Sequence, residues 1–286
     1  MPNEEHYIHN LSELIDFVKK SNVKQLHTTT NSMTWYRGQS DYEWILEPAV
    51  YREGRFNKES IYIKEFERLR PSEFQFNNNF DKLVKMQHYG LPTRLLDLTT
   101  NPLVALYFAC NENTERDGAL YAFSTPTFWE DNLVVKIVTD FIFDPEPCIQ
   151  GFVKRELMMH KLPNISLIYE EAEKRIMQIL GVPAHAILPR LTNQRILQQS
   201  GGFLLFGMSV TTIEKSTNPG TFGKEYVRYC KLDDRQRDLL CPTIIKTRIP
   251  AECKKSIIDD LYLLNINEGF LFPELEYQAK NIIKNT

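Results

Sequence analysis

The chain has 286 residues, 42% of them hydrophobic and 25% charged, which is typical of a globular protein with enough apolar material for a core. Its 34 basic and 37 acidic residues give a net charge of −3, so any contact with nucleic acid has to be a local patch. Five cysteines without a Cys-x-x-Cys pair argue against a disulfide framework and a structural zinc site. We expect a cytoplasmic protein without a membrane span, because the polar N-terminus lacks a signal segment and no apolar run is long enough.

Hydrophobic spacing and turn residues predict helices and strands in mixed order along the chain. In the first half we expect a helix at 10–20, a strand at 33–37, helices at 60–69 and 80–88, an extended segment at 93–98, a helix at 102–109 and a strand at 119–124. In the second half we expect a helix at 170–180, a short helix at 193–199, strands at 202–206 and 243–249, and helices at 250–264 and 273–283. Asn10 is expected to cap the first helix, and Gly38 to end the first strand.

The mixed order of strands and helices favours an α+β fold over a doubly wound sheet. No segment rich in proline, glycine or serine divides the chain, so we expect a single domain over 1–286. The segments near 126–190 and 207–240 carry the weakest patterns and are interpreted as insertions.

Motifs of several common enzyme classes do not occur in the chain. It has no G-x-G-x-x-G, no G-x-x-x-x-G-K-[ST], no H-E-x-x-H and no G-x-S-x-G. Its six histidines show no metal-ligand spacing. We therefore expect neither a nicotinamide-dependent dehydrogenase, nor P-loop phosphoryl transfer, nor a metal site.

The segment Trp35-Tyr36-Arg37-Gly38-Gln39-Ser40 places an arginine at the end of an aromatic strand. The following glycine allows a ligand or a backbone segment to approach closely. The guanidinium group presents its donors in a fork that suits phosphate or carboxylate, and Gln39 and Ser40 add neutral hydrogen-bonding groups. An equally open alternative is that Arg37 closes a buried salt bridge beneath a turn.

A second unusual segment, residues 87–99, gathers histidine, tyrosine, threonine, arginine and aspartate around a Gly and a Pro. Loops held at both ends by rigid elements are common places for functional residues. If residues 93–99 are extended, Arg94 lies on one face of the strand, and Asp97 and Thr99 lie on the other. Asp97 could then hold an arginine, and Thr99 could reach a ligand.

These residues also have plain structural interpretations. Asp97 and Thr99 could do no more than cap the helix that begins near Pro102. A single histidine before a turn, such as His88, is more often structural than catalytic. The residues alone leave both interpretations open.

Together these motifs resemble the FRG domain. The resemblance rests on W-Y-R-G-Q-S at 35–40, on H-Y-G-L-P-T-R-L-L-D-L-T-x-N-P-L-x-A-L-Y-F-A at 88–109 and on D-G-A-L-Y at 117–121. Two later segments are also similar: R-I-x-x-Q-x-G-x-F at 195–203 and L-F-P-E-L-E at 271–276. The departures are Leu98 in place of the usual tryptophan, and glutamates at 274 and 276 in place of aspartates.

FRG-like proteins are similar in motif order to ADP-ribosyltransferases, and the resemblance implies a toxin of an antiphage toxin–antitoxin system, as some FRG-like proteins are. The resemblance implies a split β-sheet core with surrounding helices around a cleft for NAD, which is the substrate, with no metal. In such enzymes an Arg or His ends the first strand, a Ser/Thr strand follows, and a Glu or Gln comes later. Here the matching residues are Arg37, Thr99, and then Gln199 or the pair Glu274 and Glu276.

The resemblance assigns an expected role to each candidate. Arg37 would hold phosphate, Tyr36 or Tyr89 would stack on nicotinamide, and His88 would bond ribose or take a proton from the acceptor. The expected catalytic residues are Arg37, His88, Thr99, Gln199 and Glu276. The expected NAD-binding residues are Tyr36, Arg37, Gly38, Gln39, Tyr89, Arg94, Asp97 and Thr99. Alternatively, Glu276 and its neighbour Glu274 only begin a helix.

The expected acceptor is nucleic acid, with RNA favoured, because aromatic and basic residues mix at 51–56 and 226–237. Solvated charged faces have the same composition. A toxin would also imply an antitoxin protein as partner. Two other functions stay open: a non-catalytic module that binds a nucleotide or nucleic acid, and a metal-independent ribonuclease with His88 as base.

Overall fold

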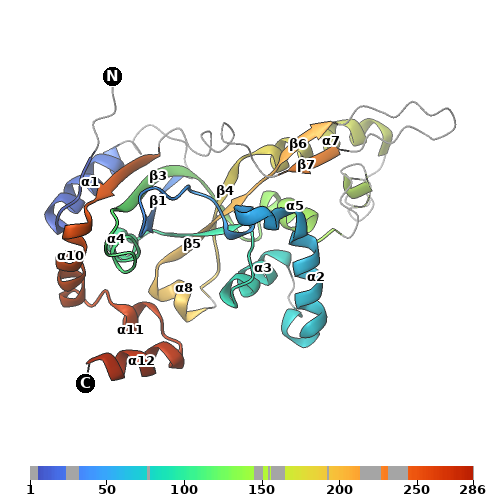
Figure 1. Ribbon diagram of the computed structural model, residues 1–286. Coiled ribbons are helices and arrows are strands. Elements are labelled where there is room, and N and C mark those ends of the chain that lie inside the picture. Colours follow the sequence, from blue (N-terminus) through green and yellow to red (C-terminus); the bar gives the residue numbers. More distant parts are fainter. Residues whose placement is uncertain are drawn as a thin grey trace.

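The computed structural model shows an α+β protein in which helices surround a small group of strands (Figure 1). The structure describes residues 6–23, 32–75, 78–144, 151–153, 155, 165–191, 193–212, 227–230 and 244–285. None of the helices within these ranges is both long and apolar enough to cross a bilayer.

Five strands close into a barrel. They are, in spatial order, β1 (Ser32–Gln39), β2 (Leu95–Thr99), β5 (Gly201–Phe206), β4 (Ala184–Leu188) and β3 (Gly118–Trp129). The ring closes because β3 pairs along its other edge with the whole of β1. All neighbours are antiparallel except β3 and β4. An additional strand, β8 (Ile245–Ile249), pairs with the first half of β3.

The weakest joint of the barrel lies between β1 and β2. These strands are paired only at Tyr36 and Thr99, whereas β2 is paired with β5 along its full length. The sequence resemblance implied a split sheet. The structure instead has a closed barrel, in which β1 and β2 are joined by a single residue pair. The α+β class is confirmed.

Helices cover two sides of the barrel (Figure 1). On one side lie α1 (Leu11–Val23), α4 (Pro102–Cys110), α10 (Ala251–Leu263), α11 (Glu268–Leu271) and α12 (Leu275–Asn285). On the other lie α2 (Glu59–Leu69), α3 (Asn79–His88), α5 (Leu133–Ile142) and α7 (Ile165–Gly181). Shorter elements are the 3₁₀ helices η2 (Ala49–Lys58) and η3 (Pro71–Phe74), the helix α8 (Gln194–Gln198) and the ribbon of β6 (Ser209–Thr212) and β7 (Val227–Cys230).

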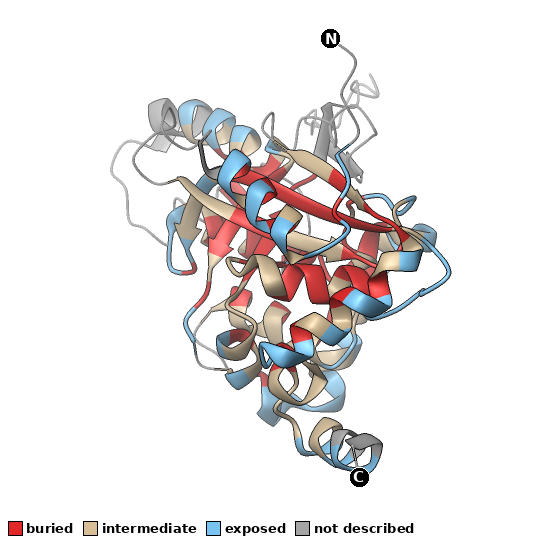
Figure 2. Ribbon diagram, turned by 90° about the vertical axis from the view of Figure 1, so that its left-hand side faces the viewer, coloured by how far each residue is buried: buried red, intermediate tan, exposed pale blue. Residues whose placement is uncertain are grey.

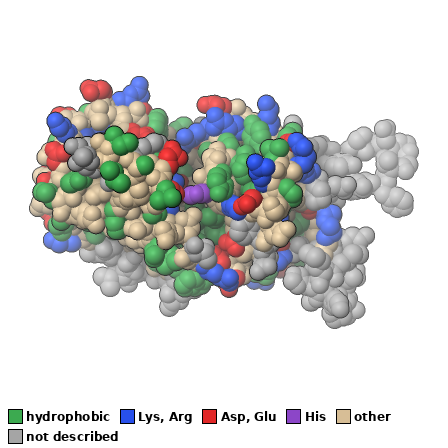
Figure 3. Space-filling model, turned by 90° about the horizontal axis from the view of Figure 1, so that it is seen from below, with side chains coloured by type: hydrophobic (Ala, Val, Ile, Leu, Met, Phe, Trp, Pro, Cys, Tyr) green, Lys and Arg blue, Asp and Glu red, His purple; other side chains and the backbone are tan. Residues whose placement is uncertain are grey.

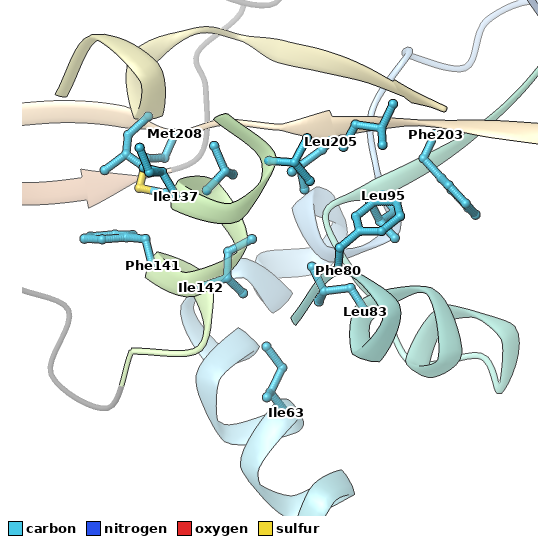
Figure 4. Close-up of a cluster of buried hydrophobic side chains, with 14 of the residues drawn as sticks. Ile63, Phe80, Leu83, Leu95, Ile137, Phe141, Ile142, Phe203, Leu205 and Met208 are labelled. Carbon is cyan, nitrogen blue, oxygen red and sulfur yellow. The ribbon is translucent and has the colours of Figure 1, made fainter. Parts of the chain in front are cut away.

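The apolar side chains form three cores, which follow the alternation of side chains along the strands. The barrel interior holds Trp35, Leu98, Tyr121 and Phe206 among others. A second core joins the outer face of the strands to α1, α4 and α10. A third joins it to α3 and α5, where the labelled residues of Figure 4 meet. Burying each large apolar side chain contributes about 1.5–3 kcal/mol, and in Figure 2 the buried residues lie on the strands and on the inward helix faces.

Most predicted elements are present within a few residues of their expected bounds, because their periodicity and turn residues are strong. Asn10 caps α1 as expected, since its side chain accepts a hydrogen bond from the Glu13 amide at 3.1 Å. The segment 126–190 contains the helices α5 and α7 and the strand β4, and of these the sequence predicted only part of α7.

The prediction that the first strand ends at Gly38 was wrong. Strand β1 continues through Gly38, which pairs with Leu120, and ends at Gln39. Glycine is required here for another reason: a Cβ atom would lie 1.8 Å from the carbonyl oxygen of Ala105 and 2.6 Å from the amide of Ala109. The lack of a side chain therefore lets the backbone of α4 pack directly on β1.

Candidate functional site

A cavity of about 270 Å³ lies where β1 and β2 separate, and we call it the β1–β2 cavity. Its walls are residues 36–40 of β1 and the turn after it, residues 97–99 of β2, the face of α4, residues 111–112, and Arg195, Gln199 and Phe272 from later in the chain. The two motif segments from the sequence thus meet in one cavity. Pairing at a single residue leaves room between the strands, and α4 closes the outer side.

Arg37 lies in the wall of this cavity. Its Nη1 donates to the carbonyl oxygen of Asp97 at 2.5 Å and so bridges the two strands. Its Nε is buried and has no hydrogen-bond partner in the part of the chain that the structure describes. Burial lowers the pKa of the guanidinium, the Asp97 charge opposes this, and nearby Arg52 lowers the pKa further. Among the described residues Arg37 forms no ion pair, so the buried salt bridge is not the role that the structure shows.

Gln39 is the second polar residue of the cavity wall whose side-chain hydrogen-bonding atoms are not all paired. Its side chain is 3% exposed, and its Nε2 donates to the Ile45 carbonyl over a long 3.4 Å. Its Oε1 is buried, and none of the described residues donates a hydrogen bond to it. Buried polar atoms are nearly always paired, so Arg37 and Gln39 together mark a place where a polar ligand would restore missing hydrogen bonds.

Lys254 fixes the far edge of the cavity from α10. It is fully buried, and its Nζ donates to the carbonyl oxygens of Ser40, Glu112 and Asn113 at 2.7, 3.1 and 3.0 Å. Burial lowers its pKa. All three ammonium donors are used, so Lys254 is a structural cation that ties the end of β1 to the segment after α4.

Charge in the β1–β2 cavity is predominantly positive. Arg37, Arg52 and Arg195 line it, against the carboxylates of Asp97 and Glu112. The Arg195 guanidinium lies over the Phe272 ring at 4.6 Å from its centroid. This arrangement suits an anionic ligand, because guanidinium groups bind phosphate in a fork geometry.

Aromatic rings also line the cavity. Trp44 is 43% exposed at its rim, whereas Tyr36 is only 2% exposed and belongs to the core against α4. Phe108 and Phe272 pack edge to face with centroids 6.1 Å apart. Trp44 is therefore the ring best placed to stack on a ligand from solvent.

The polar residues of β2 are held by side-chain and backbone contacts. The Thr93 hydroxyl donates to Oε1 of Gln87 at 2.6 Å, and Nε2 of Gln87 donates to Oδ1 of Asp97 at 2.8 Å. The Thr99 hydroxyl donates to the Gln199 carbonyl at 2.6 Å and accepts from the Asn101 amide at 2.9 Å. Thr99 lines the cavity, but its hydrogen is already engaged.

The cap of α4 is Asn101, whose side chain accepts from the Leu103 amide at 3.0 Å. The alternative that Asp97 and Thr99 cap this helix is therefore not what the structure shows. Thr99 supports the cap indirectly by holding the Asn101 amide.

Several expected site residues lie outside the β1–β2 cavity. Arg94 is buried and donates from Nε and Nη2 to Glu59 at 2.6 to 2.8 Å, with its guanidinium over Phe56. It forms a buried ion pair on the opposite face of the strand from Asp97. Tyr89 is 64% exposed, and Glu276 is exposed at the start of α12, as its helix-start interpretation predicted.

His88 lines a smaller hollow of about 100 Å³ between α3 and α8, which we call the α3–α8 hollow. Asp97, Arg195 and Gln199 line both this hollow and the β1–β2 cavity. His88 Nδ1 lies 4.0 Å from a carboxylate oxygen of Glu274. The structure thus places His88 beside the cavity rather than in it. Gln199 lines both the β1–β2 cavity and the α3–α8 hollow, and its Nε2 donates to the Leu271 carbonyl at 3.0 Å.

The cavity wall includes residues that the sequence analysis did not assign to the site, among them Trp44, Arg52, Glu112 and Arg195. Arg52 belongs to the mixed aromatic and basic segment at 51–56, and Arg195 belongs to a motif of the resemblance. The sequence therefore showed that both regions are basic, but it did not predict that these two side chains line the cavity. In that mixed segment Tyr51 is buried, with its hydroxyl donating to the Gly207 carbonyl. The second mixed segment, 226–237, falls largely outside the described residues.

No group of three His, Cys, Asp or Glu side chains with the arrangement of a metal site occurs in the described ranges. The free thiol of Cys110 is buried, which raises its pKa to about 12.

Comparison with known proteins agrees with the motifs in the first part of the chain. The family model of the FRG domain matches residues 32–118, which include both motif segments, β1, β2 and α4. A search of curated proteins and a search of solved structures each gave no match. The later motif segments, at 195–203 and 271–276, lie beyond the matched range, although their residues line the same cavity. Residues 32–118 of this chain are therefore an FRG domain.

Proposed function

We propose that the protein is an NAD-dependent ADP-ribosyltransferase whose acceptor is nucleic acid, with RNA favoured. The observation that carries the proposal is the β1–β2 cavity, which three arginines line and in whose wall Arg37 Nε and Gln39 Oε1 are buried without hydrogen-bond partners among the described residues. Two further features support it: the joint between β1 and β2 that opens the barrel, and the order of the motifs along the chain. In this proposal the barrel is a variant of the split sheet of ADP-ribosyltransferases.

The chemistry of the cavity fits one half of NAD. Small-molecule sites commonly have about 300–1,000 Å³, so a cavity of about 270 Å³ suits the nicotinamide riboside end and the adjoining phosphates. Arg37, Arg52 and Arg195 would bind the pyrophosphate. Gln39 Oε1 would accept a hydrogen bond from the nicotinamide amide. Trp44 would stack on an aromatic ring of the ligand at the rim.

The reaction would be substitution at C1′ of the nicotinamide ribose. The bond between C1′ and the nicotinamide nitrogen breaks, and its electron pair neutralises the pyridinium ring. A bond forms between C1′ and the nucleophile of the acceptor, which gives up a proton. The protein would hold the phosphates, exclude water and stabilise the positive charge that develops on the ribose.

Modification of RNA would arrest translation or RNA turnover in the cell that makes the protein, which fits a toxin of an antiphage system. Such a toxin needs restraint by an antitoxin partner. This step of the proposal rests on the sequence resemblance.

The test is mass spectrometry after incubation of the purified protein with NAD, total RNA and cell protein. We expect release of nicotinamide and a mass gain of one ADP-ribose unit on RNA. Arg37→Ala should lower product formation by at least about 10²-fold, because it removes both the phosphate contact and the bridge between β1 and β2. The matched control is Arg68→Ala, since Arg68 is exposed on α2 and, in the described part of the chain, its ion pair is with Glu65 at 2.7 Å. Thermal unfolding of each variant checks its fold.

A non-catalytic nucleotide-binding module is the second candidate, and one observation favours it. The expected catalytic carboxylate, Glu276, is exposed and does not line the β1–β2 cavity. For such a module NAD would raise the unfolding temperature of the wild type, and less so that of Arg37→Ala, without release of nicotinamide. Intact NAD together with unmodified RNA and protein would reject the transferase.

A further inference from the structure

The α3–α8 hollow lies directly beside the β1–β2 cavity and has no role in NAD binding as proposed above. It lies between the end of α3 and α8, over β2 and β5. Three side chains form the wall that both spaces share: Asp97, Arg195 and Gln199. In the space-filling view from below, a histidine side chain lies in the groove between two lobes of the surface, with basic side chains beside it (Figure 3).

Glu274 is the unexplained group beside this hollow: it does not line the hollow itself, but it lies next to His88, which does. Both of its carboxylate oxygens are buried, and neither has a hydrogen-bond partner among the described residues. A buried carboxylate without partners is costly, because its charge loses water and gains nothing in return. The nearest ionisable partner is His88, whose Nδ1 lies 4.0 Å from one of these oxygens across the gap between α3 and the segment before α12.

We propose that Glu274 is a positioning residue that orients His88, and that His88 takes the proton of the acceptor nucleophile at the α3–α8 hollow. This inference rests on the proposed transferase function. A small movement would bring Glu274 into hydrogen-bond contact with the Nδ1–H group of His88. That contact would direct the lone pair of Nε2 into the hollow and would stabilise the imidazolium once it forms.

The step balances without a further reactant. The acceptor is a hydroxyl or amino group of a nucleotide, and its oxygen or nitrogen forms the new bond to C1′. Its proton passes to Nε2 of His88, and the electron pair of the broken glycosidic bond leaves with nicotinamide. Glu274 exchanges no proton in this step and faces the new positive charge on the ring.

The geometry separates Glu274 from Glu276, which the sequence alone could not do. Glu276 is two residues further on and is exposed in the first turn of α12. The carboxyl oxygens of Glu274 are withdrawn from water next to a histidine.

The test compares Glu274→Gln and His88→Gln with a matched control. The chain contains a second histidine–glutamate pair, His9 and Glu13, whose Nδ1 and carboxylate oxygen are 2.8 Å apart on the exposed surface of the N-terminal region. Glu13→Gln removes a carboxylate from the same kind of pair far from both spaces. We expect Glu274→Gln and His88→Gln to slow transfer to RNA by about 10²-fold, which is typical of a lost general base, while NAD still protects both variants against thermal unfolding. Glu13→Gln should transfer ADP-ribose at the wild-type rate.

A second readout does not depend on catalysis. In ¹⁵N NMR spectra of the histidine side chains, the Nδ1 and Nε2 resonances of His88 report which ring nitrogen carries hydrogen. Glu274→Gln should shift these resonances, and Glu13→Gln should leave them unchanged. If the wild type neither binds NAD nor releases nicotinamide, the proposed function fails, yet the spectra still test whether Glu274 orients His88. If the wild type transfers ADP-ribose but Glu274→Gln does so equally well, or if its His88 resonances do not move, the inference is overturned.

Discussion

At the scale of single residues, the number of hydrogen-bond partners distinguishes structural from candidate functional polar groups. Lys254 is fully buried, and three carbonyl oxygens accept from it. Arg94 is buried in a bidentate pair with Glu59. Removing one partner of a buried ion pair commonly lowers the free energy of unfolding by about 3–5 kcal/mol. We therefore interpret Lys254 and Arg94 as residues that stabilise the fold. By contrast, buried polar atoms of Arg37 and Gln39 have no partner and line a cavity.

His185 gives a residue-scale prediction about pH. It is buried in β4, its Nε2 donates to the Ile179 carbonyl at 3.1 Å, and burial lowers its pKa from the ordinary 6.5. As pH falls below 6.5, the unfolded chain binds a proton at His185 that the folded protein does not bind. The free energy of unfolding therefore falls by up to about 1.4 kcal/mol per pH unit until the lowered pKa is reached.

Urea unfolding of the wild type and of His185→Gln between pH 7.5 and 5 measures this contribution. We expect a shallower dependence on pH for His185→Gln, because the variant has no group at this position that titrates in the range. Equal slopes for the two proteins would contradict the assignment.

At the scale of elements, β1 connects the barrel to the candidate site. Its inner face carries Trp35, Arg37 and Gln39, so one strand supplies a core residue and two cavity residues in alternation. Its outer face carries Tyr36 and Gly38 and packs against α4. A shift of α4 would therefore move the wall of the cavity directly.

Gly38→Ala tests this packing at the level of the element. The new Cβ atom would meet backbone atoms of α4, which cannot move away as a flexible side chain could. We expect a loss of about 3 kcal/mol or more in the free energy of unfolding, at the upper end of the range for overpacking. Gly181→Ala is the control, because no atom lies within 4 Å of its Cβ position and its φ is not in the left-handed region. That variant should stay within about 1 kcal/mol of the wild type, and a similar small effect for Gly38→Ala would contradict close packing of α4 on β1.

At the scale of the whole molecule, barrel closure links distant parts of the chain. Strand β3 pairs with β1 on one edge and with β8 and β4 on the other, so segments from residue 32 to residue 249 share one hydrogen-bonded system. The expectation of a single domain therefore has a measurable form: the barrel should unfold in one cooperative step.

Trp35 is the reporter for that measurement. It is fully buried inside the barrel, and its Nε1 donates to Thr127 at 2.9 Å, whereas Trp44 and Trp129 are 43% and 64% exposed. In a protein with Trp44→Phe and Trp129→Phe, only Trp35 fluoresces in the tryptophan range. We expect its fluorescence and the far-ultraviolet circular dichroism to give the same midpoint in urea. Separate midpoints would show that the barrel and the helices unfold independently.

The sequence by itself determined the local structure and the FRG domain at residues 32–118. Apolar spacing and helix-start residues such as Asn10 and Pro102 predicted most of the helices, because these signals act within one or two turns of chain. The two motif segments identified the FRG domain and the region of the candidate site. The alternation along residues 93–99 also correctly separated the face of Arg94 from that of Asp97.

Only the tertiary structure decided which of these polar residues belong together. Barrel closure, the continuation of β1 through Gly38, and the placement of Arg52, Arg195 and Trp44 in one wall depend on contacts between residues far apart in the sequence. The same holds for the buried pair of Arg94 and the position of Glu274 beside His88. Local patterns show that a side chain is polar or charged, but its environment is set by the segment that packs against it, and that segment has no fixed distance along the chain.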